Sequence, residues 1–261
     1  MLIRFSYEMR IDFSCPVTGH HYSLKCLPTD TARQRVKELS LSVSPTGERH
    51  EFRDFWGSDV VYGYLPEPHR HFFAVVEGVV ETGLDIFEEY DENTDIYSVQ
   101  SSFTKPGTEL SAFYSSIKQN APEDGYARLT YFSKCIHEHM QYITASTDIR
   151  TTAEQAFENR CGVCQDYAHI LISLLRMDGI PARYVVGIMA GEGESHAWVE
   201  ANLKGYWYGI DPTNDLLTDN YYIKISHGRD YRDCIVSKGV FYGMANQKQT
   251  VSVSASEVEE V

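Results

Sequence analysis

Residues 162–181 read GVCQDYAHILISLLRMDGIP, and their spacing predicts the clearest helix of the chain. Side chains that recur at intervals of three and four residues share one face of a helix that begins at or next to Cys164. This face consists of Cys164, Tyr167, Ala168, Leu171, Leu174, Leu175 and Asp178. Gly179 and Pro181 then end the helix, because proline lacks the N–H that a further turn needs. The pattern indicates a core helix with a cysteine in its first turn.

The position of Cys164 suits a reactive thiol. Thiolate is the nucleophilic form of cysteine, and the positive end of a helix dipole favours that anion. Backbone N–H groups at a helix start can also stabilise an oxyanion, and Gly162 permits a sharp entry into the helix. The alternative is an inert thiol buried beneath the helix, and for Cys164 alone the two interpretations are even.

A histidine and an aspartate follow in a pattern typical of a β-hairpin. Three strand-like runs come after the helix, at 182–190, 196–202 and 206–210. Residues 202–205 read NLKG, which predicts the loop that connects the last two runs. Counting inward from both ends places His196 opposite Asp211, to within one residue of register. Facing Cβ atoms of an antiparallel pair lie about 4.5–5.5 Å apart, close enough for a carboxylate to hold an imidazole.

The three side chains together fit covalent acyl transfer. A cysteine at a helix start, a histidine at a strand start and an aspartate across from the histidine supply a nucleophile, a base and a group that orients the base. Taken singly, His196 would more often be a surface or core residue, and Asp211 before Pro212 could simply start a turn. Their joint geometry is the argument for a catalytic triad of Cys164, His196 and Asp211.

The pattern of the chain before this helix changes twice. Short β-prone runs between turn residues fill 1–81, which predicts an antiparallel β domain. The interval 82–107 mixes acids with Gly, Ser, Thr and Pro and is typical of a solvated connection. Past residue 108 the period becomes helical, as shown by the stripe Leu129, Phe132, Ile136 and Met140.

A short helix is expected to begin after this stripe, because Thr151 and Glu154 are spaced for a capping box. We expect four parts in all. They are a β-rich N-terminal domain at 1–85, a linker at 86–107, a catalytic domain at 108–250, and a terminal strand with an acidic tail at 251–261.

Composition argues against several classes of protein. The 37 acidic residues exceed the 23 basic ones and give a formal charge of -14, so the surface repels phosphate backbones and no nucleic-acid partner is expected. The N-terminus carries charges at Arg4, Glu8 and Arg10 and fails as a signal peptide. No apolar stretch approaches the roughly 20 residues that span a bilayer, so we expect a cytoplasmic protein without a membrane partner. The six scattered cysteines do not suit a disulfide scaffold.

Four blocks of sequence, in this order, resemble the transglutaminase-like superfamily. They are 162–169, then 174–176 with 179–185, then 196–200 and 210–213. The wider chain is similar to the bacterial branch, in which a β-rich N-terminal region precedes the catalytic domain. The segments 28–30, 54–58 and 228–233 agree with that architecture.

The resemblance implies an α+β fold with a papain-like core, in which the helix bearing Cys164 packs on an antiparallel sheet. It makes Cys164 the nucleophile, His196 the general base and acid, and Asp211 the orienting carboxylate. The chain has no acidic loop of EF-hand spacing, so no calcium site and no cofactor are expected. Animal members join glutamine to lysine and need calcium, whereas bacterial members are mostly regarded as peptidases or amidases. We therefore expect a cysteine protease or amidase acting on a peptide or protein through a thioester. A cross-linking transamidase and a noncatalytic binding module are the alternatives.

The oxyanion donors and the substrate groove are less well defined by the sequence. The backbone N–H of Cys164 would be one oxyanion donor. The resemblance implies a second donor from an aromatic or polar side chain upstream, for which Gln141 and Tyr142 are candidates. Trp198 shares a strand face with His196 and is a candidate for lining the groove, with core packing as the alternative.

Cys161 and Cys164 form a C-x-x-C pair, which raises the question of a metal or redox site. Structural zinc would need a second ligand pair, and the chain has no second C-x-x-C, so no metal is expected. Cys161 could protect Cys164 by forming a disulfide, but an ordinary loop thiol is the favoured interpretation.

Overall fold

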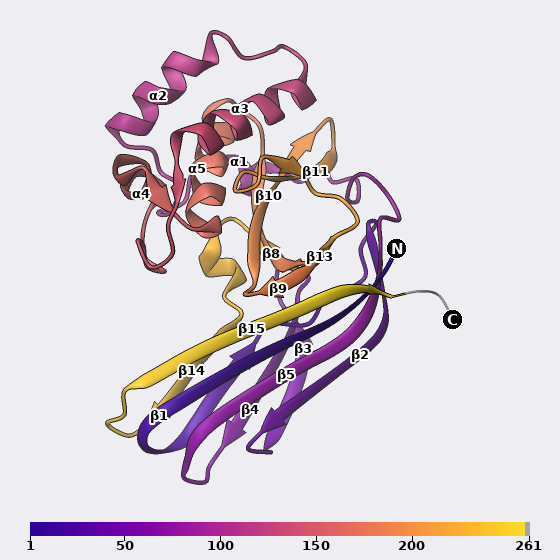
Figure 1. The fold of residues 1–261 in the computed structure, drawn as a ribbon, viewed down its shortest axis with the longest axis vertical. Helices are drawn as coiled ribbons and strands as arrows, with labels where there is room; N and C mark the ends of the chain where they lie inside the picture. The colour runs from indigo at the N-terminus through magenta and orange to yellow at the C-terminus, as the bar shows by residue number, and fades with distance from the viewer. Residues whose placement is uncertain (259–261) are drawn as a thin grey trace.

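The computed structural model describes residues 1–258, in which a β-rich domain lies beside a mixed domain of helices and strands (Figure 1). The first strands of the β-rich domain are β1 (Leu2–Leu24), β2 (Gln34–Ser44), β3 (Glu48–Arg53), β4 (Asp59–Leu65) and β5 (His69–Thr82). β1 is central, because its first half pairs with β5 and its second half with β4. Its odd-numbered side chains from Ile3 to Phe13 are buried, whereas the even-numbered ones are exposed or half-buried. This alternation places one face of the strand on a core, and it confirms the β-rich N-terminal region.

The C-terminal strands return to the same domain. They are β14 (Ser237–Tyr242) and β15 (Gln247–Val258), and both pair with β1. β15 runs antiparallel to β1 from the pair Leu2 and Val258 onward, so the start of β1 and the end of β15 lie at the same end of the sheet (Figure 1). The terminal strand expected at 251–261 is therefore part of the N-terminal sheet. Residues 259–261 of the expected acidic tail lie outside the described residues.

The helices precede the second sheet. They are α1 (Asp95–Ser98), α2 (Thr108–Lys118), α3 (Gly125–His139), α4 (Ala153–Asn159) and α5 (Cys164–Met177). The predicted stripe of α3 is buried. α5 begins at Cys164 as predicted, and each of its residues from Asp166 to Arg176 is buried, which makes it the central helix of the domain. Within residues 1–258, no helix combines the length and the apolar character needed to cross a bilayer.

α5 packs on an antiparallel sheet, as the fold prediction required. Its strands are β8 (Ala182–Met189), β10 (His196–Leu203), β11 (Tyr206–Asp211), β12 (Leu216–Leu217) and β13 (Tyr222–Gly228), in the order β12-β11-β10-β8-β13. Alternate side chains of this sheet, including Tyr184, Ala197 and Val199, join the core that α5 completes. The short strand β9 (Gly191–Gly193) instead pairs with β15, which ties the loop before His196 to the β-rich domain.

The predicted capping box of α4 is wrong by one residue. The helix begins at Ala153, so Thr152 is the N-cap and Gln155 completes the box. Glu154 has another role, since its carboxylate accepts hydrogen bonds from the backbone N–H groups of Gly107, Glu109 and Leu110 at the start of α2. The acidic side chain therefore caps a neighbouring helix.

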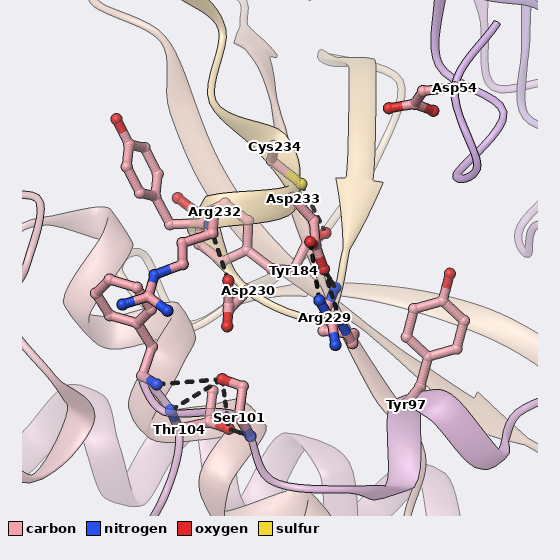
Figure 2. Close-up of polar contacts among 12 residues, drawn as sticks. Asp54, Tyr97, Ser101, Thr104, Tyr184, Arg229, Asp230, Arg232, Asp233 and Cys234 are labelled. Atoms are coloured by element: carbon pink, nitrogen blue, oxygen red, sulfur yellow. Dashed lines mark hydrogen bonds and ion pairs between the residues drawn. The ribbon is translucent and has the colours of Figure 1, made fainter. Parts of the chain in front are cut away.

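The segment 228–233, which leads into the short helix η1 (Tyr231–Cys234), is held by charged side chains (Figure 2). Arg229 donates to Asp233 through its backbone N (3.0 Å) and through Nε (2.9 Å). Beneath it, the buried guanidinium of Arg176 in α5 donates to the carbonyl oxygens of Arg229 and Ala182, both at 2.8 Å. The block therefore stabilises the packing of α5 against the sheet.

Candidate active site

The entry into α5 fixes the position of Cys164. Asp166 accepts hydrogen bonds from the backbone N of Val163 (2.8 Å) and from Thr147 Oγ1 (2.6 Å), so the turn before the cysteine is pinned on both sides. A Cβ on Gly162 would lie 2.6 Å from the Asp166 Cβ, so a side chain there would force its neighbours to shift. The glycine is required here by close approach, and the thiol is held in the first turn of the helix.

His196 and Asp211 are in contact. His196 Nε2 lies 2.6 Å from Asp211 Oδ2, and the two side chains are 12% and 0% exposed. With Nε2 occupied in this way, Nδ1 is the ring nitrogen left for Cys164, which is near enough to raise the pKa of the histidine. The structure therefore brings all three residues of the predicted triad together.

The hairpin that joins them is tighter than predicted. The loop is Lys204–Gly205 alone and not the four residues 202–205. Both loop residues have positive φ, 56° and 93°, which is the backbone geometry of a two-residue hairpin turn. The shorter loop moves Asp211 two positions away from the point opposite His196, so the predicted register is wrong and the imidazole reaches the carboxylate diagonally.

Asp211 is an ionised carboxylate surrounded by donors. Its Oδ1 accepts from the backbone N of Thr213 (2.9 Å) and of Asn214 (3.4 Å). Its Oδ2 accepts from Asn214 Nδ2 (2.7 Å) and the Tyr222 hydroxyl (2.9 Å), in addition to His196. Burial acts to raise the pKa of Asp211, but the hydrogen bonds and the charge of His196 outweigh it, and the pKa is lowered.

The same contacts keep His196 protonated. Burial is the largest influence and acts to lower its pKa, but hydrogen bonds and charges of Asp211 and Cys164 together raise the pKa of His196 from 6.5 to about 10. At neutral pH the ring is therefore an imidazolium. A cation beside a cysteine stabilises the thiolate.

Two residues of this network were missed by the sequence reasoning. Asn214 follows Asp211 in a turn, and the short polar run after Pro212 was the available signal. Tyr222 lies on β13, three strands from β11 in the sheet order, and nothing near the hairpin in the sequence points to it. Trp198 is only 2% exposed, and its ring packs edge-on against Tyr222 (5.4 Å between centroids) and 6.5 Å from the His196 ring. It lies behind the histidine and supports it.

The two candidate oxyanion donors lie on β6 (Gln141–Tyr142), which pairs in parallel with β7 (Cys161–Gly162). Tyr142 faces Gly162, two residues before the cysteine. Burial raises the pKa of Tyr142, and so do the charges of Cys164, Glu194 and Asp211. Both Gln141 and Tyr142 are exposed, and neighbouring residues of a strand point to opposite sides, so the two side chains do not lie on the same face.

The cysteines at 15, 26, 135, 161, 164 and 234 are free thiols. Cys161 is half-buried on β7 and is not bonded to Cys164. In the described part of the chain, no three His, Cys, Asp or Glu side chains are grouped so that they could hold a metal ion.

Comparisons with known proteins identify the family and the fold. Residues 112–212 match the model of the transglutaminase-like superfamily, and residues 3–81 match that of the bacterial transglutaminase-like N-terminal region. The crystal structure of a candidate cysteine protease from Cytophaga hutchinsonii has the same fold, with a TM-score of 0.74 and 24% identity over 100% of this chain and 92% of that one.

Two relatives are similar in sequence. An uncharacterized protein of Mycobacterium leprae is 27% identical over 257 residues, which cover 88% of this chain and 90% of that protein. A protein-glutamine gamma-glutamyltransferase of Pseudomonas aeruginosa is 37% identical over 70 residues, which cover 22% of this chain and 10% of that protein.

Proposed function

Because this chain belongs to the transglutaminase-like superfamily, we propose that it hydrolyses peptide or carboxamide bonds through a thioester on Cys164. The observation that carries the proposal is the buried contact of His196 with Asp211 at 2.6 Å beside the first turn of α5. A protonated imidazole held in this way both stabilises a thiolate and stands ready as a general acid. The substrate is a peptide or protein.

Acylation is the first half of the reaction. The Cys164 thiolate attacks the carbonyl carbon, and the oxygen becomes an oxyanion that accepts hydrogen bonds from the Cys164 backbone N–H and the Tyr142 hydroxyl. The carbon–nitrogen bond then breaks as His196 gives its Nδ1 proton to the departing amine. The products are a thioester and a neutral imidazole.

Deacylation reverses the roles. Neutral His196 takes a proton from a water molecule, which attacks the thioester. The carbon–sulfur bond breaks, the carboxylic acid leaves, and the thiolate and imidazolium are restored. Asp211 stays ionised throughout, because its donors hold its pKa below the ordinary value, and it keeps the ring oriented.

Transamidation is the second candidate, and the similarity to the Pseudomonas aeruginosa glutamyltransferase favours it. In that case an amine and not water attacks the thioester. We place hydrolysis first because Cys164 is partly exposed, so that water reaches the acyl group without a dedicated amine site.

Peptide-library profiling with mass spectrometry tests both candidates. Wild type and Cys161→Ala should convert a subset of peptides, whereas Cys164→Ala should convert none. Products that gain water indicate hydrolysis, and products that carry an added primary amine indicate transamidation. Conversion that persists in Cys164→Ala would refute the proposed nucleophile, and peptides that bind to every variant without conversion would favour the noncatalytic binding module.

A further inference from the structure

A cavity of about 380 Å³ lies between the β-rich domain and the second sheet, and none of the proposed catalytic residues lines it. The β-rich side and the linker supply residues 29–31, 53, 56–58 and 88–91, and the sheet supplies Arg183, Trp207 and 224–227. Arg183 and Glu200 alternate with the side chains that join the α5 core, so they lie on the opposite face of the sheet. The volume is that of a site for a small metabolite.

Three buried charged side chains line this cavity, and a fourth, Glu200, pairs with two of them. Arg183 (7% exposed), Glu200 (2%), Lys224 (7%) and Glu88 (4%) form one network. Arg183 Nε donates to Glu200 (2.5 Å), and Lys224 Nζ lies 2.7 Å from the same carboxylate and 3.7 Å from Glu88. Burying charges costs desolvation free energy that pairing often only offsets, so stability alone is weak grounds for such a network.

The polar groups at this network that lack a hydrogen-bond partner are donors. Within residues 1–258, Arg183 donates to a carboxylate through Nε alone, and its two terminal nitrogens have no hydrogen-bond acceptor among these residues. Its guanidinium carbon lies 4.2 Å from the centroid of the Trp207 ring, which fixes the plane of the fork. The Trp207 Nε1 is buried with no acceptor in the same described residues. Guanidinium and indole nitrogens can only donate.

The cations Arg183 and Lys224 both lie on the sheet wall of the cavity. Burial lowers the pKa of His227, and the cations Arg183, Lys224 and Lys25 lower it further, so that its surroundings are electropositive. Four carboxylates also line the cavity, and three of them accept hydrogen bonds from other donors: Asp30 from Arg35 (3.0 Å), Glu88 from a threonine hydroxyl (3.2 Å) and Asp91 from the backbone N of Asn93 (2.8 Å). These carboxylates do not pair with the terminal nitrogens of Arg183.

The geometry points to a second binding site, in which the free edge of Arg183 holds the oxyanion of a small carboxylate or phosphate compound. A planar guanidinium with two free N–H groups matches such an oxyanion in a bidentate manner. The site does not depend on the chemistry of Cys164. It lies between the two domains, and a ligand there would contact both.

The three tryptophans of the chain, at 56, 198 and 207, provide a direct test. Their indole N–H signals would be recorded by NMR in ¹⁵N-labelled Cys164→Ala protein, with each signal assigned by substitution to Phe. Inorganic phosphate and succinate would be titrated separately, against sodium chloride of equal ionic strength. We expect a saturable shift of the Trp207 signal and no shift of Trp198, which packs behind His196. The anion that saturates at lower concentration identifies the ligand class.

Arg183→Lys keeps the charge beside Glu200 but removes the fork, and we expect it to weaken binding about tenfold or more. Arg10→Lys, at an exposed ion pair on β1, is the matched control and should bind as wild type does. The unperturbed Trp198 signal shows that each variant is folded. The inference is overturned if neither anion gives a saturable shift of Trp207, if chloride gives the same shift, or if Arg183→Lys binds as tightly as wild type.

Discussion

Tyr222→Phe isolates one hydrogen bond to the orienting carboxylate. The substitution removes the hydroxyl that donates to Asp211 Oδ2 at 2.9 Å, while the ring keeps its edge-on packing against Trp198. A hydrogen bond to a charged group contributes about 1.5–3 kcal/mol. Because four other hydrogen bonds to this carboxylate remain, we expect the lower end, a loss of about 1.5 kcal/mol in the free energy of unfolding near neutral pH.

The pH dependence of this loss is the more specific prediction. Asp211 has a lowered pKa in the folded chain, so its contribution is present above 3.8, the ordinary value for aspartate, and is lost as the pH falls through the lower folded value. The difference between wild type and Tyr222→Phe should therefore be full at neutral pH and shrink below pH 3.8. Urea unfolding followed by tryptophan fluorescence measures it.

Tyr221→Phe is the matched control, because it removes the same hydroxyl from the preceding residue, whose side chain is 47% exposed. A surface substitution of this kind should change the free energy of unfolding by less than about 0.5 kcal/mol. The reasoning is refuted if Tyr222→Phe is as neutral as Tyr221→Phe. It is also refuted if the loss is the same at acid and neutral pH.

Three further predictions concern other parts of the account. His196 should stay protonated until about pH 10 when its Cε1–H signal is titrated by NMR, and a midpoint near 6.5 would contradict the buried pairing. The stability that the charged ring supplies is full below pH 6.5 and is lost as the pH rises through 10. Gly162→Ala places a Cβ 2.6 Å from Asp166 and should lower the free energy of unfolding by about 1–3 kcal/mol, with loss of activity. Gly125→Ala is the control: its Cβ meets a flexible side chain at 3.3 Å, and the variant should unfold in urea as wild type does. Glu154→Gln removes the charged cap of α2 and should lower the thermal midpoint by the equivalent of about 1 kcal/mol; an unchanged midpoint would argue against the cap.

Local sequence patterns predicted the parts of the site that depend on local structure. The start of α5 at Cys164 was predictable because three- and four-residue periodicity and a Gly-Pro stop lie within one helix. The contact of His196 with Asp211 was predictable because one hairpin joins them. The register was not, because it depends on a two-residue turn with positive φ at Lys204, a non-glycine residue.

Features made by distant segments were beyond the sequence patterns. Tyr222 reaches Asp211 only because β13 returns to the sheet beside β8. β15 pairs with β1 across nearly the whole chain, and no local period encodes a partner at that separation. The cavity at Arg183 has the same origin, since its walls come from three separated segments whose meeting is decided by packing.

The reactivity of Cys164 tests the central claim most directly. Iodoacetamide would be added near neutral pH, and the modified cysteines would be mapped by mass spectrometry in wild type and in His196→Ala. Cys161, half-buried and three residues away, is the internal control for access, and Cys26, whose pKa burial raises to about 12, is the control for an inert thiol. The account predicts that Cys164 is labelled first in wild type and loses that preference in His196→Ala. Slow, uniform labelling of all six cysteines in both proteins would contradict it.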